Sequence, residues 1–124
     1  MNSVMGMVTR AKAEIENLSP QEVADELRRG DVLLVDLREP AEVAGGYLSG
    51  ATFAPRGMLE FHADSATPYH LDGFREDRRV ILYCGSGARS ALAARSLQQL
   101  GYRDVAHLDG GYKAWIAAGR PVQT

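Results

Sequence analysis

Short runs of apolar residues recur along the chain and alternate with segments that have the composition of helices. Residues 32–35 and 80–83 are such runs, and residues 105–108, which include His107, are predicted to be another short buried strand; each is too short to form a helix of ordinary length. Continuous apolar runs of this length are typical of strands buried on both faces of a parallel sheet. Residues 51–53, which Pro55 follows closely, predict one more short strand.

The helices are indicated by the residues at their ends. Ser19, Pro20 and Glu22 form the pattern of a capping box with proline in the first turn, so a helix is predicted to begin there. Two more helices are predicted over residues 90–100 and 112–118, because glycine follows each segment directly and stops it.

The order of these elements predicts an α/β fold of three layers, in which helices flank a central parallel sheet. A length of 124 residues favours one domain with one core. We place this domain at residues 18–124 and expect residues 1–17 to be a loose N-terminal extension with a short helix over 11–16. Residues 56–79 are irregular and are predicted to cross the surface, where they are a candidate for one wall of a site.

Composition and charge exclude several classes of protein. The chain is 45% hydrophobic and 24% charged, and it has no apolar run near the roughly 18 residues of a membrane span. A net charge of −2 argues against a nucleic-acid partner. The three histidines, His62, His70 and His107, lack the spacing of metal ligands, so no metal site is expected. With a single cysteine and no export signal in this sequence, we expect a cytoplasmic protein.

That cysteine, Cys84, lies where the apolar run at 80–83 ends and a helix is predicted to begin. Backbone N–H groups of a glycine-bearing loop can converge on one anion, and a helix N-terminus adds a positive dipole end. The pattern therefore favours a reactive thiolate over a buried structural cysteine in an ordinary turn, although both readings remain open from the residues alone. The candidate anion-binding loop consists of Gly85, Ser86, Gly87, Ala88 and Arg89.

Four segments, in order along the chain, resemble the rhodanese (sulfurtransferase) domain family. Residues 35–42 resemble its aspartate-arginine-glutamate stretch, and residues 46–51 resemble its glycine-histidine-isoleucine-x-glycine-alanine segment. Residues 84–90, Cys-Gly-Ser-Gly-Ala-Arg-Ser, resemble its active-site loop. Residues 108–115 resemble its double-glycine and tryptophan signature. The resemblance spans residues 18–121 and implies a rhodanese-like domain.

The resemblance also implies a reaction. Cys84 would take sulfane sulfur from a donor such as thiosulfate, hold it as a persulfide and pass it to cyanide or a thiol, with Arg89 binding the donor's oxyanions. No cofactor is implied. Because the sequence has no second cysteine, the acceptor must come from outside, as a small molecule or a protein. Asp36 and Arg38 are expected to support the loop through an ion pair rather than to act in catalysis.

Two departures from the family pattern stand out. Tyr47 replaces the usual histidine, which is expected to affect packing near the strand. The excursion at residues 57–77 is longer than in the smallest members and is a candidate for altering which substrates reach Cys84.

Two alternative functions remain. The domain is alternatively a persulfide carrier or protein-interaction module without turnover. It is otherwise a thiol-based phosphatase or arsenate reductase, because those enzymes also place a cysteine in an anion-binding loop. Cysteine phosphatases have five residues between cysteine and arginine, whereas four lie between Cys84 and Arg89, and Tyr83 stands where they usually have histidine. The shorter loop favours sulfur over phosphate.

Overall fold

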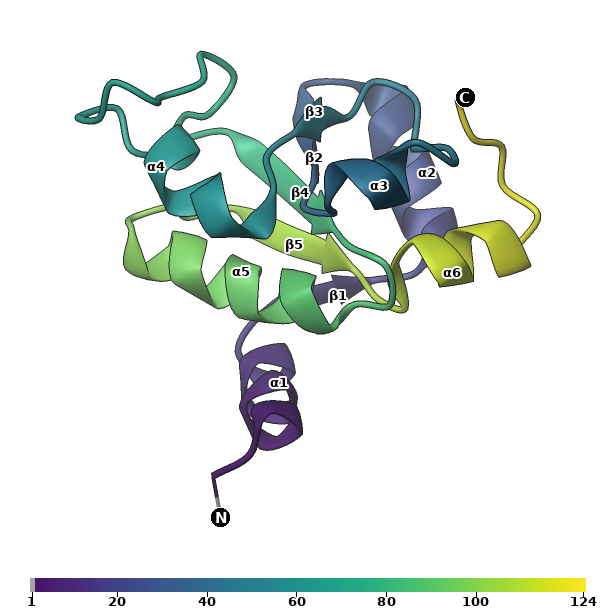
Figure 1. Cartoon of the computed structure of the whole chain (residues 1–124), viewed down its shortest axis with the longest axis horizontal. Coiled ribbons are helices and arrows are strands. Elements are labelled where there is room, and N and C mark those ends of the chain that lie inside the picture. The colour runs from purple at the N-terminus through teal and green to yellow at the C-terminus, as the bar shows by residue number, and fades with distance from the viewer. Residues whose placement is uncertain (1) are drawn as a thin grey trace.

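Five parallel strands form the central sheet of the protein, in a computed structural model that describes residues 2–124 (Figure 1). Their order across the sheet is β1-β5-β4-β2-β3, so β4, which ends directly before Cys84, is central. The predicted three-layer α/β fold is confirmed. The strands are β1 (Glu16–Leu18), β2 (Val32–Asp36), β3 (Thr52–Phe53), β4 (Arg79–Tyr83) and β5 (Val105–Leu108).

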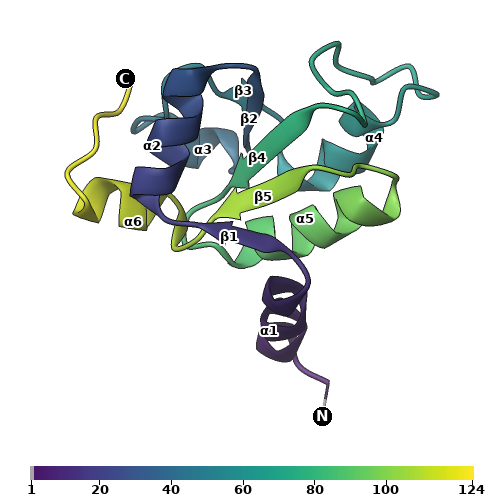
Figure 2. The ribbon, with the colours of Figure 1, turned by 180° about the vertical axis from the view of Figure 1, so that it is seen from behind.

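Helices cover both faces of this sheet, α4 and α5 on one and α2 and α6 on the other (Figures 1 and 2). Side chains alternate along β4: Val80 and Leu82 pack with the α4 and α5 side, while Ile81 and Tyr83 pack with α2 and α6. Burial on both faces explains why the strands are continuous apolar runs. The helical elements are α1 (Val4–Ala13), α2 (Pro20–Arg29), α3 (Pro40–Val43), the 3-10 turn η1 (Arg56–Met58), α4 (Leu59–Ala63), α5 (Ala88–Gln99) and α6 (Gly111–Ala117).

The predicted capping box begins α2. The Ser19 hydroxyl accepts the Glu22 backbone N–H at 3.1 Å, and the Glu22 carboxylate accepts the Ser19 N–H at 2.9 Å. Each side chain therefore accepts the backbone N–H of the other residue. Because the first N–H groups of a helix have no partner within the helix, these two bonds stabilise its start.

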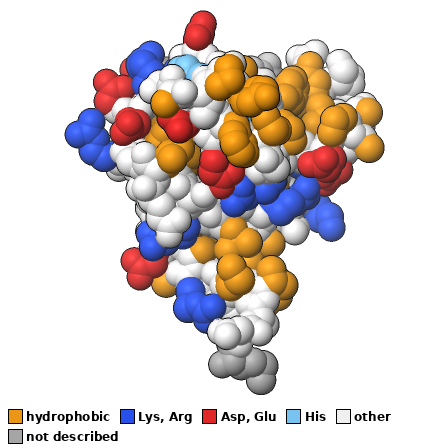
Figure 3. Space-filling model, turned by 60° about the vertical axis from the view of Figure 1, so that its left-hand side comes forward, with side chains coloured by type: hydrophobic (Ala, Val, Ile, Leu, Met, Phe, Trp, Pro, Cys, Tyr) orange, Lys and Arg blue, Asp and Glu red, His pale blue; other side chains and the backbone are white. Residues whose placement is uncertain are grey.

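The N-terminal segment differs from the loose tail we expected. Its helix, α1, begins seven residues before the predicted 11–16 and ends at Ala13, and it packs Val8 and Ala11 against Ala91 of α5. Glu16 and Asn17 lie in β1, which pairs with β5. This edge strand has no apolar run that would predict it from the sequence, because Leu18 is its only buried residue. Apolar side chains gather at the end of the molecule where α1 lies, and Val4, Met5 and Met7 are exposed there (Figure 3).

The long excursion between β3 and β4 is anchored to the core but lies mostly away from Cys84. Phe74 is buried, and the Tyr102 hydroxyl donates to the Ala63 carbonyl at 2.8 Å. Residues 64–78 lead into the amino end of β4, whereas Cys84 follows its carboxyl end (Figure 1). That part of the excursion therefore lies at the amino-terminal ends of the strands, whereas Cys84 lies at their carboxyl ends. No helix within residues 2–124 is long and apolar enough to cross a membrane.

Candidate active site

Cys84 is 1% exposed, and its sulfur accepts two backbone hydrogen bonds, one from the loop that follows and one from the start of α5. The N–H groups of Gly87 and Ser90 approach Sγ to 3.2 and 3.3 Å. Of the loop residues expected to face the anion, Gly87 does so, and Ser90 joins it from the first turn of α5. Gly85, Ser86 and Ala88 carry the chain around this turn, and Ser86 is exposed. Two N–H donors at a helix N-terminus favour negative charge on the sulfur.

Glycines allow the loop to fold tightly against the start of α6. Gly87 has φ +98°, and a Cβ there would lie 3.0 Å from the Gly110 nitrogen. Gly111 has φ +63°, and its Cβ would lie 2.6 Å from the Cys84 carbonyl oxygen, which accepts the Tyr112 N–H at 2.8 Å. The double glycine thus brings the start of α6 onto the cysteine loop, which gives that sequence signature a physical reason.

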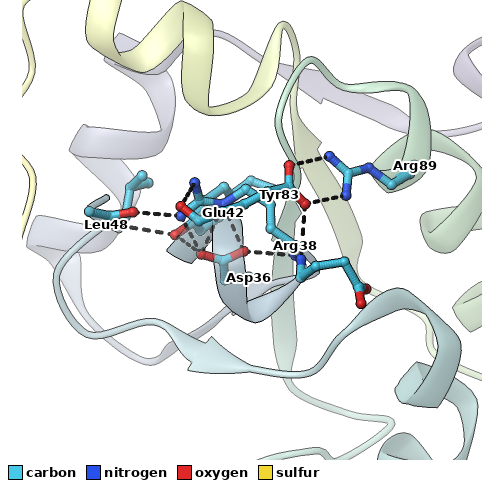
Figure 4. A network of polar contacts seen from close by, with 8 residues as sticks. Asp36, Arg38, Glu42, Leu48, Tyr83 and Arg89 are labelled. Carbon is cyan, nitrogen blue, oxygen red and sulfur yellow. Dashed lines mark hydrogen bonds and ion pairs between the residues drawn. The ribbon is translucent and has the colours of Figure 1, made fainter. Parts of the chain in front are cut away.

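Arg89 forms a bidentate ion pair with Glu42 of α3 (Figure 4). Its Nη1 and Nη2 lie 2.8 and 2.9 Å from the two carboxylate oxygens, and both side chains are more than a third exposed. The hydrogen bonds from Arg89, then one within α3's capping box, lower the pKa of Glu42 to about 2. Arg89 was expected to hold donor oxyanions, and in the structure a carboxylate already holds two of its nitrogens.

Asp36 and Arg38 form a buried ion pair beneath the loop (Figure 4). Arg38 donates from Nη2 to Asp36 Oδ2 at 2.8 Å and from the same nitrogen to the Gly46 carbonyl at 2.7 Å. The Tyr83 hydroxyl donates to Asp36 at 2.5 Å and accepts the Leu48 N–H at 3.0 Å. Burial, and then the bond to Asp36, raise the pKa of Tyr83. The network ties the ends of β2 and β4 to the segment before β3.

Arg38 also stacks over the ring of Tyr112 in α6, with its guanidinium carbon 4.1 Å from the ring centroid. Tyr47, which stands at the position of the family's usual histidine, packs edge-on against Phe53 at 5.1 Å between centroids. The Arg38–Tyr112 contact joins the segment after β2 to the start of α6, which lies on the cysteine loop.

Two buried polar side chains, Ser90 and His107, form a hydrogen-bonded pair next to Cys84, and neither was predicted from the sequence. Ser90 Oγ lies 3.5 Å from Cys84 Sγ and 2.7 Å from Nδ1 of His107, a fully buried residue of β5. Burial lowers the pKa of His107 to about 4. The available signal was a histidine inside an otherwise apolar strand, where a polar side chain needs a partner.

Comparison with known proteins gives consistent matches. The sequence model of the rhodanese-like domain matches residues 19–118. A sulfurtransferase from Allochromatium vinosum is 41% identical over 92 residues, 74% of this chain and 78% of that protein. Thiosulfate sulfurtransferase GlpE from Ectopseudomonas mendocina is 33% identical over 108 residues, 85% and 88% of the two chains. A solved structure from Rhodopseudomonas palustris, of unknown function and described as a possible tyrosine phosphatase, has a TM-score of 0.92 at 37% identity and covers 99% of this chain and 96% of its own.

Proposed function

This chain belongs to the rhodanese-like domain family of sulfurtransferases, and we propose that Cys84 is the residue that carries its sulfur. The observation that supports this role best is the pair of N–H groups, from Gly87 and Ser90, that converge on Sγ. They favour the thiolate needed for attack. The lone cysteine also supports a reducing, cytoplasmic setting, where a free thiol persists.

The proposed reaction has two steps. The Cys84 thiolate attacks the outer sulfur of thiosulfate, the S–S bond of the donor breaks, and sulfite leaves with its electron pair. The resulting persulfide anion, Cys–S–S⁻, is then attacked at its outer sulfur by cyanide or a thiolate, which regenerates the Cys84 thiolate. A thiol acceptor must be external, because the sequence has one cysteine.

Persulfide formation is directly measurable. After incubation with thiosulfate and removal of excess reagent, the intact protein is expected to gain the mass of one sulfur atom, which dithiothreitol then removes. Cys84→Ala, whose small apolar side chain has no thiol, is expected to gain no mass. The same gain in Cys84→Ala, or no gain in the unaltered protein with any sulfane donor tried, would contradict the role of Cys84.

We further propose that Arg89 binds the donor's oxyanions and that Glu42 competes with them. Arg89→Ala is expected to raise KM for thiosulfate about 10- to 100-fold, since a hydrogen bond to a charged group contributes on the order of 1.5–3 kcal/mol. kcat should change less, because the attacking sulfur keeps its N–H donors. Steady-state kinetics with cyanide as acceptor measures both constants, and Arg95→Ala on α5 is the matched control.

Glu42→Gln separates competition from positioning. If the carboxylate competes with donor oxyanions for Arg89, this change lowers KM for thiosulfate. A raised KM would instead mean that Glu42 holds Arg89 in place, and an unchanged KM in Arg89→Ala would mean that backbone N–H groups alone bind the donor.

A second candidate, phosphate ester hydrolysis, is favoured by the relative described as a possible tyrosine phosphatase. The length of the cysteine loop favours sulfur transfer over phosphate ester hydrolysis. Four residues separate Cys84 from Arg89, one fewer than the five of cysteine phosphatases, so the loop is shorter than the one that wraps a tetrahedral phosphate. Hydrolysis of an aryl phosphate that disappears in Cys84→Ser would reverse this preference.

A further inference from the structure

A chain of hydrogen-bonded side chains leads from Asn17 of β1 through His107 of β5 and Ser90 of α5 to Cys84. Asn17 Oδ1 lies 2.7 Å from His107 Nε2, and His107 Nδ1 lies 2.7 Å from Ser90 Oγ. Ser90 Oγ lies 3.5 Å from Cys84 Sγ. His107 and Ser90 are fully buried, so each of their polar atoms needs a partner within the protein.

The contacts of Asn17 fix the positions of the protons in this chain. Its amide nitrogen donates to the carbonyls of Lys12 at 2.9 Å and Ile15 at 3.2 Å, so its oxygen is the atom that faces His107. An oxygen acceptor requires the proton of a neutral imidazole to be on Nε2. Nδ1 is therefore an acceptor, and Ser90, whose hydroxyl also lies 3.3 Å from the Gly87 carbonyl, donates its single proton to Nδ1, the nearer acceptor at 2.7 Å.

This assignment sets what Ser90 offers to the sulfur. With its proton directed to His107, the hydroxyl presents a lone pair to Sγ, and the Cys84 thiol donates to that lone pair. If the thiol proton moves to Ser90 Oγ while the hydroxyl proton moves to Nδ1, both hydrogen bonds reverse and no heavy atom needs to move. The S–H and original O–H bonds break, a new O–H and an N–H bond form, and the products are a thiolate and an imidazolium.

We propose that His107, acting through Ser90, accepts the proton of Cys84 as the sulfur attacks its donor. This inference rests on the proposed role of Cys84 as the sulfur carrier. Ser90 contacts the reacting sulfur, and His107 is a positioning residue that receives the proton through it. Asn17 stabilises the imidazolium because its oxygen accepts the remaining Nε2 proton.

The charges around His107 suit a base that is neutral at rest. Lys12 of α1 and Asp109, which follows β5, pair with each other at 2.8 Å. Burial lowers the pKa of His107, with Asp109 opposing this shift and Lys12 adding to it. Leu82, its partner in β4, is apolar, and Arg89 at the mouth of the loop is held by Glu42. A lone imidazolium is thus disfavoured, and proton uptake is coupled to the appearance of negative charge on Cys84.

The rate of persulfide formation against pH tests the proposal. We expect Ser90→Ala and His107→Asn to react about 10- to 100-fold more slowly with thiosulfate at pH 7, the usual range for loss of an acid–base group. Both are expected to approach the unaltered protein above the pH at which the thiol ionises unaided. A purely structural role would lower the rate by the same factor at every pH. His62→Asn, in α4, is the control and should follow the unaltered protein.

An equal or faster rate at pH 7 in Ser90→Ala, or a constant ratio across the pH range, would overturn the relay. Ser90→Ala is the smaller change and decides the matter if His107→Asn does not fold. Alkylation by iodoacetamide over the same pH range is the parallel readout, because it needs no sulfur donor. If the unaltered protein forms no persulfide but both variants show the pH-dependent alkylation defect, the proposed sulfur transfer fails while the relay stands.

Discussion

Cys84→Ser is expected to reduce thiocyanate formation from thiosulfate and cyanide by at least about 10³-fold, as expected when a covalent nucleophile is lost. The serine side chain is close to cysteine in size, and its Oγ can accept the Gly87 and Ser90 N–H groups in place of Sγ. Its hydroxyl is almost entirely protonated at neutral pH, and oxygen does not form the persulfide that carries the transferred atom. The colorimetric assay of thiocyanate at saturating donor measures the loss.

The loss of activity in Cys84→Ser can be assigned to the reacting atom only if the variant folds like the unaltered protein. Thermal unfolding of Cys84→Ser is expected to match that of the unaltered protein, because both side chains fit the same buried space. Turnover within about tenfold of the unaltered protein would mean that sulfur passes from donor to acceptor without residing on Cys84. A stable persulfide in the unaltered protein without thiocyanate formation would instead identify a sulfur carrier that awaits a specific acceptor.

The strands and the cysteine loop were predictable because their signals are local. A parallel strand buried on both faces is mostly apolar, as β4 is over residues 80–83, and the helix α2 begins at a capping box only four residues long. Cys84 stood out because an apolar run gives way there to glycines. Each of these features is determined by residues adjacent in the sequence.

The contacts that complete the site join residues far apart in the sequence, so no local pattern indicates them. Glu42 is 47 positions from Arg89, and Asn17 is 90 positions from His107. The expectation that Arg89 binds the donor's oxyanions followed from the loop sequence and the family resemblance, and neither indicates the ion pair with Glu42. Asn17 belonged to a segment expected to be loose, since an edge strand with one buried residue has no apolar run. An ion pair between α5 and α3 joins Arg89 to Glu42, and the pairing of β1 with β5 brings Asn17 beside His107.

Arg38→Ala is expected to lower the free energy of unfolding by about 3–5 kcal/mol, the usual result of removing one partner of a buried ion pair. Asp36 is fully buried, and the change would leave its carboxylate with the Tyr83 hydroxyl and the backbone N–H of residue 38 as donors. The stacking on Tyr112 is lost as well. Urea unfolding followed by circular dichroism measures the difference.

Arg28→Ala is the matched control, because Arg28 pairs with Asp25 on the exposed face of α2. Exposed ion pairs contribute about 0–1 kcal/mol, so this variant should be nearly as stable as the unaltered protein. The double change Asp36→Asn with Arg38→Met removes both charges and is expected to recover part of the loss. If Arg38→Ala cost less than about 1 kcal/mol, the buried pair would not be what holds the strand ends together. Activity per folded molecule within about threefold at low temperature would place Arg38 in support of the loop, since loss of a group acting in the chemistry costs roughly 100-fold or more.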